Sequence, residues 1–229
     1  MTTTPRERAR TRTLADITRI GREHLAVDGA AALSLRAVAR DLGVVSSAVY
    51  RYVKSRDELL TLLVVDAYTE LGDEVDEAVD ALDSAVEKFL VLGRTVRAWG
   101  LREPAGYALL FGSPVPGYHA PAEHTTGPGT RVIVKLVEIF DAAWRAGRLV
   151  ERPTTVSLSG LHQSFVEVRN EMGTNMSDEA LARGVLVWAS LFGAVSFDVF
   201  DQYGSSTFSA RDQLFEHQLA LLVELAGLT

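Results

Sequence analysis

The spacing of apolar residues predicts helices along almost the whole chain. Apolar positions recur every three or four residues, and no stretch shows the alternation of a half-buried strand. Proline, glycine and serine clusters divide this pattern into long helices, which we expect at about residues 56–79, 82–102, 130–146, 154–172, 177–200 and 209–225. Residues 112–129 hold four prolines and four glycines and predict a long loop. The pattern therefore indicates an all-α fold.

Residues 34–56 predict two short helices joined by a tight turn. The first helix has a buried stripe formed by Leu35, Val38, Ala39 and Leu42. Gly43 suits the turn, because glycine accepts the left-handed conformation found at helix C-termini. We expect Val44 and Val49 to fill the wedge between the two helices. This arrangement is typical of a helix-turn-helix reader of DNA.

The distribution of charge supports that interpretation. The 229 residues carry a net charge of −7, but residues 1–56 hold eleven Lys and Arg against five acidic residues, a net +6. The remainder holds 12 basic and 25 acidic residues, a net −13. A basic head on an acidic body indicates local contact with nucleic acid. We therefore predict a three-helix DNA-binding domain at residues 1–55, which starts with a loose basic arm at residues 5–13, and a larger helical regulatory and dimerisation domain at residues 56–229.

The motif at the end of this head resembles a known family. Leu42-Gly43-Val44, followed by the segment VYRYVKSRDELL at residues 49–60, resembles the signature of TetR-type transcriptional regulators. Two positions depart from the usual pattern: Tyr52 stands where His is frequent, and Arg56 stands where Lys is frequent. Both replacements keep side chains that can bind phosphate. The resemblance is specific over about residues 10–65 and only architectural over the body.

The resemblance implies roles for residues at matched positions. Those implied to contact DNA are Ser34, Arg36, Ser46, Ser47, Tyr50, Arg51, Tyr52, Lys54 and Arg56. The side-chain chemistry agrees in part, since Ser, Tyr and Arg reach phosphates or base edges, and Arg51 is the best candidate for a bidentate contact with guanine. The alternatives are that Tyr50 is mainly a core residue and that the basic arm is idle.

In the resembled family, the last two long helices of each subunit form a four-helix dimer interface. Residues 177–200 are apolar nearly all round, so this helix must be buried on more than one side. We expect the interface at Val187, Trp188, Leu191, Phe192, Val195, Phe215, Leu219 and Leu222. The alternative is an intramolecular core. A homodimer would present two reading heads to a pseudo-palindromic operator in double-stranded DNA.

The resemblance also implies a small-molecule pocket in the body. The candidate lining residues are Trp99, Tyr107, Phe111, Tyr118, Trp144, His162, Phe165, Val166 and Arg169. An apolar lining with a few polar groups suits a ligand site. His162 and Arg169 could orient a polar ligand or could form an ordinary ion pair. The sequence does not tell whether the 112–129 loop gates such a pocket, and it names no effector.

Other functions find little support in the sequence. No catalytic or phosphate-binding motif is present, so we predict that the chain is not an enzyme and needs no cofactor. His119 and His124 form a poor ligand set, and we predict no metal site. The chain has no cysteine, and its most apolar stretch, residues 185–197, is too short to span a bilayer, so we expect a cytoplasmic protein without a membrane partner.

These observations predict a sequence-specific DNA-binding regulator, most simply a homodimeric repressor that an unknown small-molecule effector releases from its operator. The sequence does not separate repression from activation and identifies neither the operator nor the regulated genes. The alternative from a different class is a helical small-molecule-binding protein or enzyme whose basic N-terminus is incidental.

Overall fold

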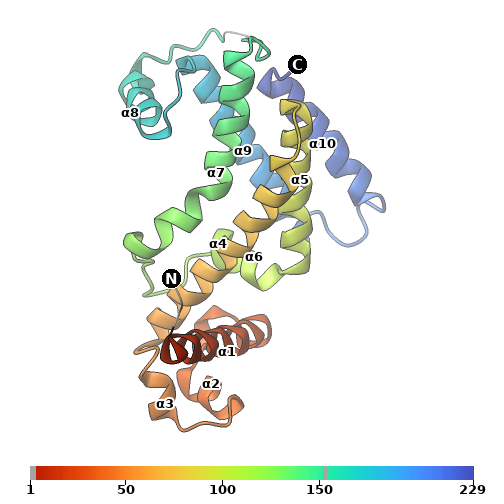
Figure 1. The fold of residues 1–229 in the computed structure, drawn as a ribbon. Helices are drawn as coiled ribbons and strands as arrows, with labels where there is room; N and C mark the ends of the chain where they lie inside the picture. The colour runs from red at the N-terminus through yellow and green to blue at the C-terminus, as the bar shows by residue number, and fades with distance from the viewer. Residues whose placement is uncertain (1–3, 152–153) are drawn as a thin grey trace. The chain divides into compact units, whose positions relative to one another are not determined.

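The computed structural model describes residues 4–151 and 154–229, which form helices and connecting loops without a multi-residue strand. The elements are α1 (Pro5–Asp28), the short 3-10 helix η1 (Ala30–Ala32), α2 (Leu35–Asp41), α3 (Ser46–Tyr50), α4 (Arg56–Asp80), α5 (Ala85–Arg102), α6 (Pro104–Phe111), α7 (Ala122–Arg145), the 3-10 helix η2 (Ser159–Leu161), α8 (His162–Met172), α9 (Asp178–Val199) and α10 (Arg211–Ala226) (Figure 1). The predicted all-α class is confirmed.

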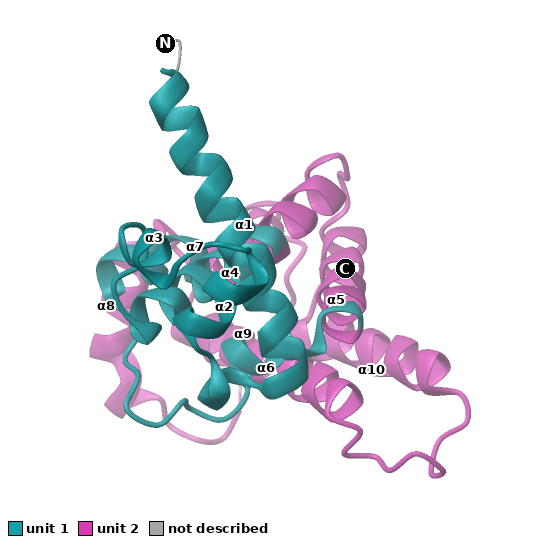
Figure 2. Cartoon of the chain, turned by 90° about the horizontal axis from the view of Figure 1, so that it is seen from below, with its two compact units in different colours: residues 1–70, 102–129 teal, residues 71–101, 130–229 magenta. Residues whose placement is uncertain are grey.

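The chain divides into two compact units (Figure 2). One comprises residues 1–70 and 102–129, and the other comprises residues 71–101 and 130–229. This division differs from the boundary predicted after residue 55. Buried leucines at the start of α4, among them Leu59, Leu60 and Leu63, complete the core that α1, α2 and α3 begin, and α6 packs against α1.

The N-terminal basic segment is helical, and the expectation of a loose arm was wrong. Thr4 and Glu7 form a reciprocal capping box, in which the Thr4 backbone N–H donates to the Glu7 carboxylate at 2.7 Å and the Glu7 N–H donates to the Thr4 hydroxyl at 3.3 Å. Pro5 occupies the first helical turn, where its missing N–H costs nothing. These local signals start α1 at Pro5 and carry the arginines of the arm on a helix.

The predicted long loop is shorter than its composition indicates. It ends at residue 121, and α7 begins at Ala122 and continues through Pro128. Gly129 lies against the ring of Tyr68, and a Cβ atom at this position would meet a ring carbon at 3.2 Å. Helix α5 ends at Arg102, the residue at which the pattern ended this helix, and Pro104 takes the first-turn position of α6, a helix the sequence pattern did not predict.

The C-terminal residues close the second unit against the segment that follows α7. Leu149 and Leu228 form an isolated antiparallel bridge, and the Val150 N–H donates to the Gly227 carbonyl at 2.8 Å. Gly227 has a φ of +74°, and a Cβ atom there would lie 2.3 Å from the Val150 carbonyl oxygen. Only glycine fits this position.

Two further expectations for this unit change. The helix predicted from residue 154 begins at His162, and the residues 154–161 before it are mainly exposed. Within the described chain, α9 is the one helix long and apolar enough to cross a membrane by length and composition, and a third of its most apolar window is buried in the fold. Its length exceeds the 185–197 stretch on which the sequence argument rested, so that argument does not exclude a span.

Candidate functional site

The helix-turn-helix has the predicted turn. Gly43 has a φ of +68°, and the N–H groups of Gly43 and Val44 donate to the carbonyls of Arg40 and Ala39, each at 3.0 Å. Val49 is buried with Val38, Ala39 and the other core residues of this unit. Val44 is 44% exposed, so the expectation that it fills the wedge between the helices was wrong.

Three basic side chains of the helix-turn-helix are exposed and have no ion-pair partner among the described residues. Arg36 on α2, and Arg51 and Lys54 after α3, are exposed. The structure gives none of them an ion-pair partner within the described chain, whereas most other arginines are paired. Unpaired exposed cations on one short segment can neutralise phosphates without first breaking an internal bond.

The hydroxyl-bearing candidates divide into exposed and half-buried residues. Ser47 and Tyr50 are exposed, so Tyr50 is a surface residue and not mainly core. Ser34 is the N-cap residue of α2, but its hydroxyl makes no capping bond there, and Ser46 begins α3 half-buried. Tyr52 is half-buried against the core, and its ring lies 5.7 Å below the guanidinium of Arg10, which belongs to the basic segment of α1.

Arg56 is placed differently from the phosphate-binding role implied for it. Its Nη2 donates to the carbonyl oxygens of Ala30 at 2.8 Å and Ala31 at 3.2 Å. Its Nε is buried. The guanidinium therefore ties the first residue of α4 to η1 and is engaged within the protein. Ser55 beside it caps α4, since its hydroxyl accepts from the Glu58 N–H at 3.1 Å.

A charged contact holds α1 against α2. The His24 Nε2 and the Asp41 Oδ2 lie 2.6 Å apart, and the hydrogen bond with His24 lowers the pKa of Asp41. On the opposite side of α1, Arg22 pairs with Asp66 at 2.8 Å and also with Glu70. Burial raises the pKa of Asp66 despite that partner. These contacts fix α2 and α4 to α1 and so orient the exposed face of the helix-turn-helix.

In the second unit, α9 has one buried face and one exposed apolar face. Val187, Leu191 and Val195, which the sequence assigned to the dimer interface, are fully buried inside the subunit, and Phe215, Leu219 and Leu222 on α10 are also buried. These residues form the core in which α9 packs on α10, so this part of the predicted interface was wrong, except that Leu222 also lines the groove described next. The large apolar residues that remain 41–55% exposed on these two helices are Val185, Leu186, Trp188, Phe197 and Leu221.

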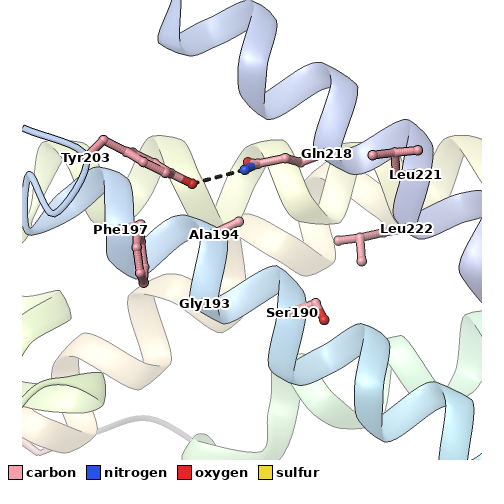
Figure 3. Close-up of a pocket in the computed structure, with 8 residues that line it drawn as sticks. All are labelled: Ser190, Gly193, Ala194, Phe197, Tyr203, Gln218, Leu221 and Leu222. Atoms are coloured by element: carbon pink, nitrogen blue, oxygen red, sulfur yellow. Dashed lines mark hydrogen bonds between the residues drawn. The ribbon is translucent and has the colours of Figure 1, made fainter. Parts of the chain in front are cut away.

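The exposed face contains a groove of about 360 Å³ (Figure 3). Its lining combines small and apolar residues of α9 with residues of α10 and of the loop between them, namely Ser190, Gly193, Ala194, Phe197, Tyr203, Gln218, Leu221 and Leu222. The Gln218 side chain donates to the Tyr203 hydroxyl at 3.0 Å and closes one end. A Cβ atom at Gly193 would meet nothing within 4 Å, so the floor of the groove is open. We call this groove and the exposed apolar residues around it the α9–α10 face.

The predicted ligand residues are divided between the two units. Tyr107, Phe111 and Tyr118 belong to the first unit, and the other candidates belong to the second, among them Trp99 and Trp144. Trp99 and Tyr107 are completely buried. The Tyr118 hydroxyl lies 3.1 Å from that of Thr61, and Phe111 packs against Tyr107. These aromatic residues serve largely as core.

His162 and Arg169 form an ordinary ion-pair cluster. Both reach Asp178 at the start of α9, with N–O distances of 2.7 Å each, and their hydrogen bonds lower the pKa of Asp178. Val166 is half-buried on the same helix, and Phe165 is buried. The described residues contain no group of three His, Asp or Glu side chains that could hold a metal ion.

The geometry agrees with comparisons to known proteins. A family model described as tetracyclin repressor-like, C-terminal domain, matches residues 89–222. The chain is 44% identical over 220 residues to the HTH-type transcriptional regulators Rv1816 of Mycobacterium tuberculosis and Mb1846 of Mycobacterium bovis, and the match covers 95% of this chain and 94% of each relative. A solved structure of the regulatory protein SCO4313 is 32% identical, with a TM-score of 0.78, and covers 96% of this chain and 100% of that chain.

The chain belongs to the TetR family. This TetR-family protein is a DNA-binding transcriptional regulator, which confirms the resemblance drawn from residues 42–60. The family is one of regulators and not of enzymes. The sequence reasoning named Trp188 but missed the other exposed apolar residues of α9, because a helix that is apolar on every side gives no signal of which face is covered within the folded chain.

Proposed function

We propose that this TetR-family regulator is a homodimer that represses transcription from a pseudo-palindromic operator and leaves it when a small molecule binds. The observation that supports the proposed dimer is the exposed, apolar α9–α10 face. An exposed apolar surface with an open groove is unusual on a monomer and marks an interaction site. A second copy provides a complementary surface of the same kind through a two-fold axis.

Two reading heads would place their recognition elements about one helical turn of DNA apart, roughly 34–36 Å. Ser47, Tyr50 and Arg51 would approach the major groove. Arg36 and Lys54 would hold phosphates, and Ser34 and Ser46 would add contacts at the helix starts. In this proposal, Tyr52 supports Arg10 and Arg56 anchors α4, so both act indirectly. The protein would act in the cytoplasm, on chromosomal DNA.

Helix α4 could transmit the effect of ligand binding to the DNA-binding helices, because it runs from Arg56 to Asp80. Its first residue, Arg56, is bound to η1 within the reading head. Further along, α4 and α7 form an ion-pair ladder, in which Arg131 pairs with Asp76 at 2.5 Å and Lys135 pairs with Asp80 at 2.9 Å. A ligand that favours one position of α7 would shift α4 and the spacing of the two heads. It can shift this equilibrium only by its difference in affinity for the two states.

The dimer is tested by replacing Phe197 with Glu. The exposed ring lies in the groove, so a carboxylate there should give monomers in light scattering and reduce operator affinity at least 100-fold, because one head alone makes half the contacts. Val156→Glu is the matched control, since Val156 is 73% exposed outside these helices, and should remain dimeric. A dimeric Phe197→Glu protein would refute the interface.

Repression is tested separately with the unmodified protein. In transcription from a template that carries the operator over the promoter, added dimer should lower transcript yield. An increase would assign the protein to activators and leave the dimer proposal intact.

A further inference from the structure

A cavity of about 280 Å³ lies among α7, α8 and α9 in the second unit. Its walls include Phe140 of α7, Phe165 and Met172 of α8, Met176 of the following loop, and Gly184 and Trp188 of α9. Phe140, Phe165 and Met176 are buried, whereas Trp188 is 41% exposed. The cavity thus has a buried interior and one accessible side.

The chemistry of the lining is uniform. Every described residue that lines the cavity is apolar or aromatic, and the side-chain heteroatoms are the methionine sulfurs and the indole nitrogen of Trp188. Three nearby charged residues on α8 and α9 are paired with one another, since His162 and Arg169 both bind Asp178. A charged ligand would lose its hydration here without gaining a partner, which is costly.

The size of the cavity limits its occupant. A helix from another protein is about 10 Å wide and cannot enter a space of this volume, so the buried walls are accessible only to a small molecule. Apolar cavities of about 150 Å³ stay dry and hold benzene, so this one has room for roughly eleven carbon atoms by the same scale. Methionine side chains at Met172 and Met176 adapt readily to different shapes.

We propose that this cavity binds an uncharged, apolar small molecule of about ten to twelve carbon atoms. The inference rests on the ligand response proposed above, for which it names the effector class and the site. A bound molecule would hold α7 and α8 against α9. It would also contact Trp188, whose side chain is partly exposed on α9.

The probe is naphthalene, which has ten carbons and no charge, and the matched probe is 2-naphthoate, which adds a carboxylate to the same rings. Titrations use the full-length protein without DNA and follow tryptophan fluorescence and thermal unfolding. We expect saturable binding of naphthalene, a raised Tm, and at least tenfold weaker binding of 2-naphthoate. Equal binding of both probes, or no saturable binding of naphthalene, would overturn the proposal.

Variants locate the site. Gly184→Leu should fill the cavity and weaken naphthalene binding at least tenfold. Ala189→Leu, an exposed position on the same helix outside the cavity lining, should leave the dissociation constant unchanged. If Gly184→Leu does not fold, Gly184→Ala replaces it: a Cβ atom there meets the Phe140 ring at an ordinary 3.5 Å, and the added methyl should weaken binding severalfold. Unchanged binding in the folded Gly184 variants would refute this location.

Operator binding without any probe is measured on the same proteins. If naphthalene binds in the cavity but the protein fails to bind its operator, the proposed repressor function is wrong and the cavity assignment stands. If the operator is bound tightly but naphthalene is not, the cavity assignment alone fails.

Discussion

Lys54 and Arg56 lie on either side of Ser55, yet the structure predicts opposite consequences for removing them. Lys54 is exposed and has no ion-pair partner in the described chain, so its charge is available to DNA. Arg56 donates to two carbonyl oxygens of η1 and is partly buried. We therefore expect Lys54→Ala to weaken DNA binding without loss of stability, and Arg56→Ala to do the reverse.

The magnitudes follow from these contacts. Each phosphate contact steepens the slope of log K against log salt by about 0.9. The proposed dimer carries two copies of Lys54, so Lys54→Ala should reduce the magnitude of this slope by about 1.8, which is a loss of roughly 30-fold in affinity at 0.15 M salt. Its unfolding free energy should stay within about 0.5 kcal/mol of wild type. Loss of the charged hydrogen bonds in Arg56→Ala should cost about 2–3 kcal/mol in unfolding free energy, with an unchanged salt slope.

The assay is fluorescence anisotropy of a labelled operator duplex at 0.05–0.3 M KCl, with urea unfolding of the same preparations. Arg56→Lys is the control, because it keeps the charge but loses the planar fork that spans two carbonyls. It should be destabilised and retain the wild-type slope. A reduced slope for Arg56→Ala at a concentration where it is folded, or an unchanged slope for Lys54→Ala, would refute this assignment of roles.

Three further outcomes are expected. Asp198→Asn should cost about 3 kcal/mol in urea unfolding, because the buried Asp198 carboxylate accepts from Arg97 at 2.6 Å and its loss leaves that cation to the exposed Asp212, a weaker partner; a change below 1 kcal/mol would contradict this. The hydrogen bond from Arg94 lowers the pKa of Glu216 below 4.5, so this stabilisation is present above pH 4.5 and disappears as the pH falls through the lowered value. Arg94→Met should remove at most about 1 kcal/mol at pH 7, since the pair is half exposed, and progressively less as the pH falls through the lowered pKa of Glu216. Arg51→Ala should cost about 1–3 kcal/mol in operator affinity and relax base preference at one position, and a uniform loss across sequences would instead indicate a phosphate contact.

The helix-turn-helix was predictable because the sequence features that specify it lie close together in the chain. Gly43 takes the left-handed conformation that the turn requires, and Leu35, Val38 and Ala39 form the expected buried stripe. The role of Arg56 was not predictable from the motif, because its acceptors lie in η1 and are brought to it by folding. The motif identifies a basic residue, but only the folded structure shows whether its side chain is bound within the protein or available to DNA.

Predictions based on residue composition were wrong where local packing favoured a different structure. Glycine and proline at residues 127–129 indicated a loop, but α7 runs through them, with Gly129 packed against Tyr68. The aromatic residues chosen for a pocket were mostly core, since large rings bury the most apolar area and are the first to be covered on folding. Of the predicted residues, Phe165 lines the cavity, but the walls also use Met172, Met176 and Gly184, residues that carry no sequence signal for ligand binding.

Helix α9 shows why the sequence predicted the proposed dimer face only in part. Val187, Leu191 and Val195 repeat at intervals of four and face the subunit core, while Leu186, Gly193 and Phe197 follow the opposite side. Both stripes have the same helical period, so periodicity predicts that two faces are covered and cannot assign either one to its partner. The structure separates them by burial: the first stripe is already covered within one chain, and the second leaves apolar area that folding of a single chain does not remove from water. That remaining area is the physical reason to expect a second copy.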